Sequence, residues 1–437
     1  MNLSSSISIL LKSVKVMSLQ LSEDVQKFLK EEYPNADIDN MSLEELKTFK
    51  EEIVQKRQEL NLLELTQKRL GNAAYGASAS PYFYFFNVDL AADITGECRH
   101  LTKTMWDKFE QWFHHDIWER KDLWEKFDFA LDPAKKEWFE SRSISIYSDT
   151  DSVYVTYGDF FECFTDEYKK KYDTDRKKID WILKYNKEFQ DKQNTAWCEE
   201  IYGPRHGKNV HNFELETISR ACINLKKKKY LKALSYYKGK FYDDPKIAGT
   251  GIEIIKSTTP KLCREILTDL TRSLVFETAE MDRESYIYYF NDKLAKYKKQ
   301  FYTAPIEDIS MSVGIGDYEK YVIDDKDQLV LGKQCPVSVQ AIARYNQLAH
   351  INGEDNKRQI SGKIKYYNIR LSNNKNVSSG YFGFPSGELP DWAPKIALDI
   401  QWEKTIVDPI NRFLEVMDLP LVNSAGVMQL SLFGYDE

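Results

Sequence analysis

Hydrophobic and polar residues alternate on both sides of a short acidic segment near residue 150. Ile144 and Ile146 precede this segment, and Val153 and Val155 follow it, each pair separated by one residue. Alternation with a period of two is typical of β-strands with one buried face. The Asp-Thr-Asp-Ser sequence between them is rich in turn-forming residues. The pattern predicts a β-hairpin over residues 144–157 with two carboxylates at its tip.

Apolar residues at three- and four-residue steps predict a long helix over residues 42–76. Ser42 and Glu45 have the spacing of a capping box at its start. We expect the helix to continue through Gly71, and residues 21–32 to form a partner helix. The apolar positions of the long helix are Leu46, Phe49, Ile53, Leu60, Leu63 and Leu70.

A polar stripe follows the opposite face of the long helix. Lys68, Asn72 and Tyr75 are spaced i, i+4 and i+7, so they share one face, away from the leucines. From the spacing alone, an ordinary solvated helix face is the better interpretation. Further along, residues 80–250 are mixed and rich in aromatic residues, and from Thr259 onward the pattern is mainly helical.

The two acids of the hairpin suggest a cation site. Asp149 and Asp151 are two residues apart, and on extended backbone such side chains point the same way. Two carboxylates held close together are unfavourable unless a cation lies near them. An ordinary turn explains the tetrapeptide about equally well, but the flanking strands and Tyr147 favour a metal site.

Composition indicates a folded protein with room for two or three domains. The 437 residues are 42% hydrophobic and 30% charged, and no apolar run is long enough to span a bilayer. The amino-terminal segment lacks the basic start and cleavage site of a secretory signal. Six scattered cysteines without a Cys-x-x-Cys pair predict reduced, buried thiols of a cytosolic protein. We expect no membrane partner.

Charge is distributed unevenly along the chain. The net charge is −7, yet residues 221–261 contain ten lysines against three acids. Local lysine clusters are typical of surfaces that meet nucleic-acid phosphates, although a solvated charge run is the commoner interpretation.

Three motifs, in this order, resemble the carboxy-terminal half of a family B DNA polymerase, most closely the replicative polymerases of T-even-like bacteriophages. Lys68–Gly76 resembles the fingers motif Lys-x-x-x-Asn-Ser-x-Tyr-Gly, with Ala73 for Ser. Tyr147–Ser152 resembles the palm motif Tyr-Gly-Asp-Thr-Asp-Ser, with Ser148 for Gly. Lys227–Tyr230 resembles the duplex-contacting motif Lys-Lys-Arg-Tyr.

The resemblance implies an α+β right-hand polymerase with helical half-fingers, a palm of mixed β-sheet and helices, and a mainly helical thumb. The match to the thumb entry lies in Gly251-Ile252-Glu253 and the following Ser257–Lys261. The expected segments are a leader (1–20), fingers (21–78), palm (79–250), thumb (251–427) and a clamp-binding tail (428–437).

The palm resemblance implies metal-dependent nucleotidyl transfer. Asp151 is expected to be the direct Mg²⁺ ligand, and Asp149 to tune the site electrostatically. Glu216 falls where relatives place an accessory acid near the metals, although an isolated Glu is more often an ordinary surface residue. Two-metal catalysis suits this reaction because divalent ions neutralise charge on the attacking and leaving oxygens.

The fingers resemblance implies contacts with the incoming deoxynucleoside triphosphate. Lys68 is expected to pair with triphosphate oxygens, while Asn72 and Tyr75 line the nascent base pair. Replacement of the usual Ser by Ala73 removes a secondary polar contact.

The basic motif implies contacts with the template-primer DNA. Lys227, Lys228 and Lys229 would attract its phosphates, and Tyr230 would help to grip the duplex.

The end of the chain has the form of a sliding-clamp-binding peptide, with Gln429, Leu430, Leu432 and Phe433 as the contacting residues. T-even-like polymerases end similarly. A terminal strand packed on its own domain is the alternative.

Some polymerase motifs are missing. No segment matches the Asp-x-x-Ser-Leu-Tyr-Pro motif that supplies the other palm metal ligand, and no exonuclease motif is present. We therefore expect a naturally split polymerase in the cytoplasm of an infected bacterial host, whose two-metal site is completed by an amino-terminal polymerase chain. A cloned fragment or a gene remnant is the other account of these gaps.

Two alternatives belong to other classes of protein. A catalytically silent DNA- and clamp-binding structural subunit would keep Asp149 and Asp151 only as turn residues. A reverse transcriptase or primase-like enzyme would place two Asp side by side, a pattern that Thr150 interrupts.

Overall fold

The computed structural model describes most of the chain between residues 33 and 428, apart from several short segments. The predicted leader (1–20), the predicted partner helix (21–32) and the clamp-binding residues 429–437 lie outside the described residues. The described residues are 33, 40–206, 211, 213–277, 281–322, 327–329, 334–358, 362–373 and 376–428, with backbone alone for 204–206, 372–373 and 376–379.

The chain divides into two compact units. Unit 1 contains residues 1–218 and 235–243, and unit 2 contains residues 219–234 and 244–437. Within the described part of the chain, no helix combines the length and the apolar character needed to cross a bilayer.

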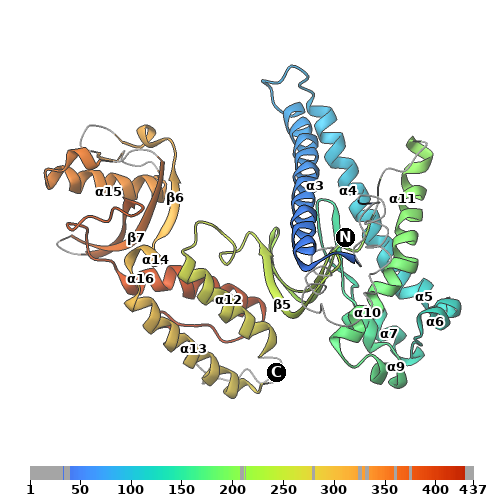
Figure 1. Ribbon diagram of the computed structural model, residues 1–437. Coiled ribbons are helices and arrows are strands. Elements are labelled where there is room, and N and C mark those ends of the chain that lie inside the picture. The colour runs from blue at the N-terminus through green and yellow to red at the C-terminus, as the bar shows by residue number, and fades with distance from the viewer. Residues whose placement is uncertain are drawn as a thin grey trace. The chain divides into compact units, whose positions relative to one another are not determined.

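Unit 1 is mainly helical, with one small β-hairpin (Figure 1). Its elements are α3 (Leu43–Ser78), α4 (Val88–Gln111), η2 (Trp112–Asp116), α5 (Ile117–Glu119), α6 (Lys121–Phe127), η3 (Pro133–Lys135), α7 (Lys136–Glu140), β1 (Ser145–Asp149), β2 (Ser152–Val155), α8 (Gly158–Glu162), α9 (Asp166–Lys171), α10 (Asp175–Tyr185), η4 (Asn186–Gln190) and α11 (Asp191–His206).

The long helix confirms the sequence prediction. The backbone N–H of Ser42 donates to Glu45 Oε2 (2.7 Å), and that of Glu45 donates to Ser42 Oγ (3.3 Å), which completes the capping box. The helix runs through Gly71 to Ser78, and α3 and α4 lie side by side, joined by a loop at one end (Figure 1).

Aromatic side chains dominate the core of unit 1. Trp181 stacks on Tyr185 with 5.0 Å between ring centroids. The hydroxyl of Tyr185 accepts a hydrogen bond from Trp112 Nε1 (2.8 Å), so its buried polar tip is satisfied. Leu101, Met105 and Phe109 are successive i+4 positions of α4 and belong to the same core.

A meander of β3 (Thr217–Lys226), β4 (Lys229–Tyr237) and β5 (Lys240–Thr250) forms a sheet in the order β3-β4-β5. Two-residue turns join its strands, at Lys227–Lys228 and at Lys238–Gly239. The boundary between the two units crosses these strands.

Unit 2 combines a helical core with an antiparallel sheet. Its remaining elements are α12 (Lys261–Phe276), α13 (Arg283–Thr303), α14 (Ile306–Ile309), β6 (Met311–Ile315), η6 (Tyr318–Lys320), α15 (Val337–Ile351), η7 (Asp355–Lys357), β7 (Gly362–Asn373), β8 (Asn376–Pro385), α16 (Leu398–Trp402), η8 (Glu403–Val407) and α17 (Asp408–Val416).

The helices α12 and α13 confirm the predicted helical pattern, but the sheet was not predicted. Strand β7 pairs with β6 on one side and with β8 on the other, both antiparallel. Helix α15 packs against this sheet, where Ile342 and Tyr345 join Tyr367 and Phe382 in one core. The region expected to be a mainly helical thumb therefore also contains a sheet layer.

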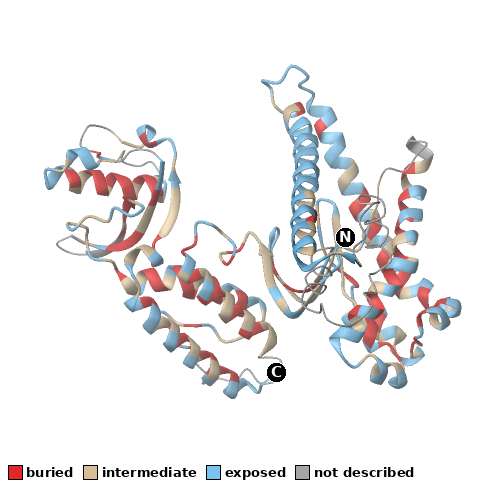
Figure 2. Ribbon diagram, in the orientation of Figure 1, coloured by how far each residue is buried: buried red, intermediate tan, exposed pale blue. Residues whose placement is uncertain are grey.

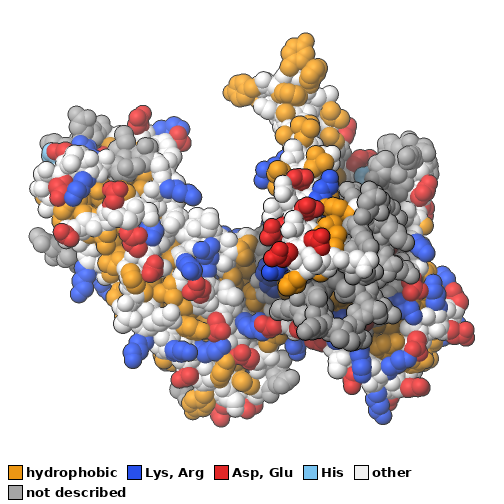
Figure 3. All heavy atoms as spheres, viewed as in Figure 1, with side chains coloured by type: hydrophobic (Ala, Val, Ile, Leu, Met, Phe, Trp, Pro, Cys, Tyr) orange, Lys and Arg blue, Asp and Glu red, His pale blue; other side chains and the backbone are white. Residues whose placement is uncertain are grey.

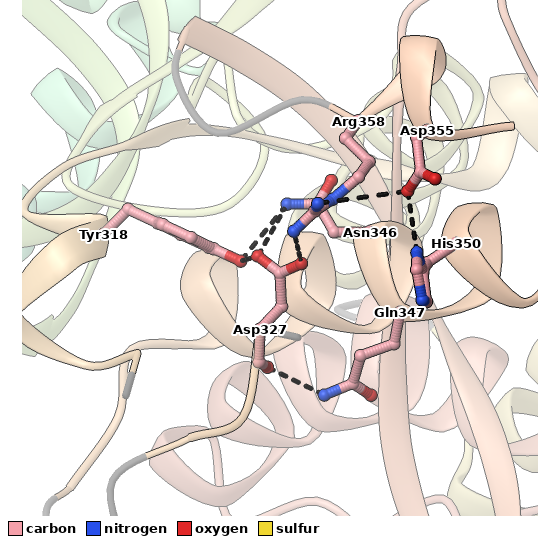
Figure 4. Close-up of polar contacts among 7 residues, drawn as sticks. All are labelled: Tyr318, Asp327, Asn346, Gln347, His350, Asp355 and Arg358. Atoms are coloured by element: carbon pink, nitrogen blue, oxygen red, sulfur yellow. Dashed lines mark hydrogen bonds and ion pairs between the residues drawn. The ribbon is translucent and has the colours of Figure 1, made fainter. Parts of the chain in front are cut away.

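A buried polar cluster attaches the segment around residue 327 to α15 (Figure 4). Asp327 is only 3% exposed and forms an ion pair with Arg358. Its carboxylate also accepts hydrogen bonds from Tyr318 Oη (2.6 Å) and Asn346 Nδ2 (3.2 Å). Its carbonyl accepts from Gln347 Nε2 (2.8 Å). A buried carboxylate is costly unless it is paired and hydrogen-bonded, and here several partners stabilise that of Asp327.

The cysteines agree with the prediction of reduced thiols. All six are free; Cys163, Cys198 and Cys263 are buried and the other three are half-buried. Burial raises the pKa of Cys163 and Cys263 to about 12 and that of Cys198 to about 11. Such thiols are poor nucleophiles at neutral pH, so these three have a structural role.

Candidate functional site

The acidic hairpin forms as predicted, but its tip is tighter than an extended strand. Asp149 ends β1 and pairs with Ser152, the first residue of β2, leaving Thr150 and Asp151 as a two-residue turn. The N–H of Asp151 donates to the carbonyl of Asp149 (2.6 Å). The prediction that both acids lie on extended backbone was therefore wrong, because the chain reverses direction between them.

Thr150 has a strained backbone conformation at the centre of this turn. Its φ is +53°, in the left-handed region that β-branched residues rarely adopt. Its hydroxyl donates to Asp149 Oδ1 (3.1 Å), and Ser152 Oγ donates to the Asp149 carbonyl (3.0 Å). Local hydrogen bonds thus order the turn that carries the acids.

The two carboxylates have the chemistry of a partial magnesium site. Asp151 is exposed and Asp149 is half-buried, so both lie at the surface of unit 1. Magnesium prefers oxygen ligands and is commonly bound by one or two carboxylates together with substrate phosphates and water. The pair fits such a role. Among the described residues, no group of three or more His, Cys, Asp or Glu side chains gathers that could hold a metal ion.

The strands behind the tip differ in detail from simple alternation. A bulge separates Ser145 from Tyr147 in the β1–β2 register, so Ile144 is buried whereas Ile146 is exposed. The next pair, Tyr147 and Tyr154, brings its rings into edge-to-face contact at 5.3 Å. This cross-strand contact stabilises the hairpin two residue pairs away from the pair Asp149–Ser152.

Helix α4 contacts the hairpin at both of its ends. Near the tip, Thr102 Oγ1 donates to the carbonyl of Thr150 (2.9 Å). Near the base, Glu110 accepts hydrogen bonds from the N–H of Ser145 (2.7 Å) and the hydroxyl of Ser143 (2.8 Å). Sequence reasoning missed both residues. The available signal was a threonine beside the apolar positions Leu101 and Met105, where a polar side chain needs a partner.

The three predicted nucleotide-contacting residues share one exposed face of α3. Lys68, Asn72 and Tyr75 are all exposed, so the predicted polar stripe exists. Figure 2 shows that almost the whole of α3 is exposed. A ligand role for these residues stays a prediction.

Among the described residues, those that cover the apolar face of α3 lie near its start. Ile53 is buried, and Phe49 contacts Tyr33 edge to face at 5.1 Å. Leu60 and Leu63 are about half exposed, and Leu70 is 71% exposed. The leucines were expected to face a partner helix, whose residues lie outside the described part of the chain.

The loop between α3 and α4 presents exposed aromatic side chains. In this segment, Tyr82–Phe86, termed the aromatic loop, Tyr82 is 98% and Tyr84 is 91% exposed. Figure 3 shows a cluster of hydrophobic side chains at this end of the two helices. Apolar clusters of this kind often mark surfaces that bind another protein.

The basic motif divides into exposed lysines and a buried tyrosine. Lys227 and Lys228 form the β3–β4 turn, and Lys229 begins β4; all three are exposed. Tyr230 is only 8% exposed, so most of its ring is covered within the chain, and its expected part in gripping DNA stays a prediction. The exposed lysines lie in the turn and at the first position of β4, whereas Tyr230 and Leu231, which follow, are both buried.

Gly251 lies against the β3–β4 turn formed by Lys227 and Lys228. Its φ is +64°, and a Cβ atom there would lie 2.3 Å from the carbonyl oxygen of Lys228. Only glycine allows such an approach without displacing the backbone. The thumb-entry motif at Gly251 is therefore in direct contact with Lys227–Lys229, termed the lysine turn, although the two are separate in sequence.

Two acids near these motifs have cationic partners. Glu216 is exposed and pairs with Lys238 Nζ (3.4 Å) at the β4–β5 turn. Glu253, next to the thumb-entry glycine, pairs with Arg412 (2.8 Å) and with Lys256 (3.3 Å). Burial acts to raise the pKa of Glu253, but Arg412, a backbone hydrogen bond and Lys256 together outweigh it and lower the pKa below its usual value.

No protein-family model matches the chain. The chain is similar to the DNA-directed DNA polymerase of Escherichia phage RB69, with 21% identity over 385 residues. The similarity covers 84% of this chain and 38% of the phage enzyme, so the chain spans well under half the length of that relative. This distant similarity supports the relationship to phage DNA polymerases that the sequence motifs indicated.

Proposed function

We propose that this chain is the carboxy-terminal part of a family B, phage-type DNA-directed DNA polymerase. The observation that carries the proposal is the acidic turn at Asp149–Asp151, formed on a hairpin in a chain similar over most of its length to a phage polymerase. An amino-terminal polymerase chain would supply the remaining palm carboxylate and the exonuclease.

The proposed chemistry is template-directed nucleotidyl transfer. Asp151 and Asp149 would hold Mg²⁺, which when bound neutralises charge on the attacking and leaving oxygens of the phosphoryl group. In this proposal both carboxylates would reach one metal ion, and the Thr150 hydroxyl, which donates to Asp149 Oδ1, would order the turn between them. Glu216 has a lysine partner already, so we assign it no role in the reaction.

The proposed substrate contacts use exposed side chains. On α3, Lys68 would pair with the triphosphate, and Asn72 and Tyr75 would line the base pair that it forms. Exposed lysines are suited to attract phosphates. The lysine turn would hold template-primer DNA through Lys227, Lys228 and Lys229, while the buried Tyr230 would support the strand beneath them.

The exposed apolar surface supports the need for a partner chain. Leucines of α3 and the aromatic loop leave hydrophobic side chains in contact with water, and covering them would be favourable by about 25 cal/mol per Å² of buried apolar area. The sliding clamp, bound through the tail, and the cytoplasm of an infected bacterium stay part of the proposal.

Primer extension tests the proposal. This chain, the amino-terminal chain and their mixture are assayed separately with Mg²⁺, deoxynucleoside triphosphates and a primed template. Only the mixture is expected to synthesise DNA, and Asp151→Ala should abolish its activity. Asp173→Ala is the control, because this exposed acid pairs with Lys177 (2.8 Å), far along the chain from the acidic turn.

Two outcomes would contradict the proposal in different ways. Robust synthesis by this chain alone would remove the need for a second chain. An active Asp151→Ala mixture would favour the catalytically silent DNA- and clamp-binding subunit.

A further inference from the structure

We propose that Thr102 of α4 is a positioning residue for the acidic tip: its hydrogen bond to the Thr150 carbonyl fixes the orientation of Asp149 and Asp151. The inference rests on the proposed function for its effect on catalysis. Its structural part, the ordering of the tip, is independent of that function and can be measured in the chain alone.

The contact joins two elements that are distant in sequence. Thr102 Oγ1 lies 2.9 Å from the Thr150 carbonyl and 2.7 Å from the carbonyl of Cys98, one turn earlier in α4. A hydroxyl has one proton to donate, so these two carbonyls share it. Thr102 is 6% exposed, whereas Thr150 is exposed. A buried donor on a rigid helix thus holds an exposed turn.

The turn needs support from outside the hairpin. Thr150 has a positive φ, which costs a β-branched residue free energy that the surroundings must offset. Within the described residues, β1 and β2 pair only with each other, and an isolated hairpin of two strands is marginally stable in water. The acids would lose their fixed orientation if the turn relaxed.

Glu110 provides the second point of attachment. It lies eight residues further along α4, about 12 Å along the helix axis, and binds the backbone at the start of β1. The hairpin is therefore held at its base by Glu110 and at its tip by Thr102. With the base fixed, the Thr102 contact helps to set the direction in which the tip points.

Hydrogen exchange tests the structural part. Thr102→Val removes the hydroxyl with little change in shape, Thr102→Ser keeps it, and Thr104→Val is the matched control. Thr104 lies on the same helix and bonds its own i−4 carbonyl, that of His100 (2.9 Å). We expect faster exchange at residues 149–153 in Thr102→Val alone, with unchanged exchange at the base. If Thr102→Val does not fold, Thr102→Ala is compared with Thr102→Ser.

Kinetics of the reconstituted mixture test the catalytic part. In Thr102→Val we expect kcat to fall roughly 10-fold, as when a group that orients a metal ligand is lost. KM for the nucleotide and the affinity for the duplex should not change, and Thr102→Ser should restore kcat.

The outcomes are distinguishable. Unchanged tip exchange in Thr102→Val would overturn the inference. Faster exchange with unchanged kcat, in a mixture that Asp151→Ala inactivates, would overturn the catalytic role while leaving the proposed function intact. A mixture that stays active with Asp151→Ala would refute the proposed function, and the role of Thr102 in catalysis with it.

Discussion

Gly251 shows how a missing side chain allows close packing against the Lys227–Lys228 turn. We predict that Gly251→Ala lowers the free energy of unfolding by about 1–2 kcal/mol from backbone strain at positive φ. The substitution should lower the free energy of unfolding by a further ~1–3 kcal/mol, because the new methyl group clashes with the Lys228 carbonyl. Denaturant unfolding measures both effects.

Gly353 is the matched control for this prediction. Its φ is +71°, but an added Cβ would have nothing within 4 Å, so Gly353→Ala isolates the strain. Equal destabilisation by the two variants would show that the approach to Lys228 has no energetic importance.

Because the pKa of Glu253 is lowered, we predict that its contribution to stability depends on pH. Its pKa is lowered in the folded chain, so its contribution is complete above the pKa of the unfolded chain and is lost as the pH falls through the lowered value. Glu253→Gln should therefore lower Tm at pH 7 but have little effect in strong acid. A constant difference in Tm across this range would contradict the assignment.

Glu265→Gln is the comparison for the pH series. Glu265 and Lys261 form an exposed pair at 3.9 Å on α12, and such surface pairs contribute little. The Tm of this variant should follow that of the unsubstituted chain throughout.

At the scale of elements, the β3–β4 turn and the start of β4 place three exposed lysines, Lys227–Lys229, side by side. We predict that Lys228→Ala/Lys229→Ala weakens duplex binding and lowers the slope of log affinity against log salt by about 2. Lys320→Ala, which removes an exposed lysine paired with Asp317, should not change the slope. Binding titrations over a range of salt concentrations test this, and an unchanged slope in the double variant would remove these lysines from the interface.

Elements with local signals were predictable from the sequence. The capping box at Ser42 and the apolar spacing of α12 depend on residues three or four positions apart, and the hairpin depends on alternation around turn residues. In the missed sheet, the β7–β8 hairpin is local, with Asn373 paired to Asn376, so its two strands were an available signal. Strands β6 and β7, in contrast, pair across about fifty residues. No local pattern encodes such a pairing.

The candidate site was predictable in its residues but not in its support. Asp149 and Asp151 could be identified from the motif, whereas the contact from Thr102 spans 48 positions and depends on how α4 packs. Burial of Tyr230 was equally hidden, since a strand residue beside exposed lysines can face either way until the sheet is known.

At the scale of the whole molecule, the exposed apolar surface of α3 and the aromatic loop predicts self-association of the chain alone. Tyr84→Ser/Phe85→Ser should reduce this self-association and also weaken binding to the amino-terminal chain. Light scattering and size-exclusion chromatography measure the two effects.

Tyr288→Ser is the control for this surface. Tyr288 is an exposed aromatic residue on α13, in the other unit, and its replacement should affect neither measurement. If the double variant binds the amino-terminal chain as tightly as before, the aromatic loop does not belong to the interface.

The aromatic loop also has a consequence for the cell that makes this chain. Exposed apolar side chains make a chain prone to aggregation and a target for chaperones. Under the proposed function, chain made in excess of its partner would be aggregated or degraded, so its abundance would follow that of the partner. Matched translation of the two polymerase parts would then limit how fast an infection can assemble its replication machinery.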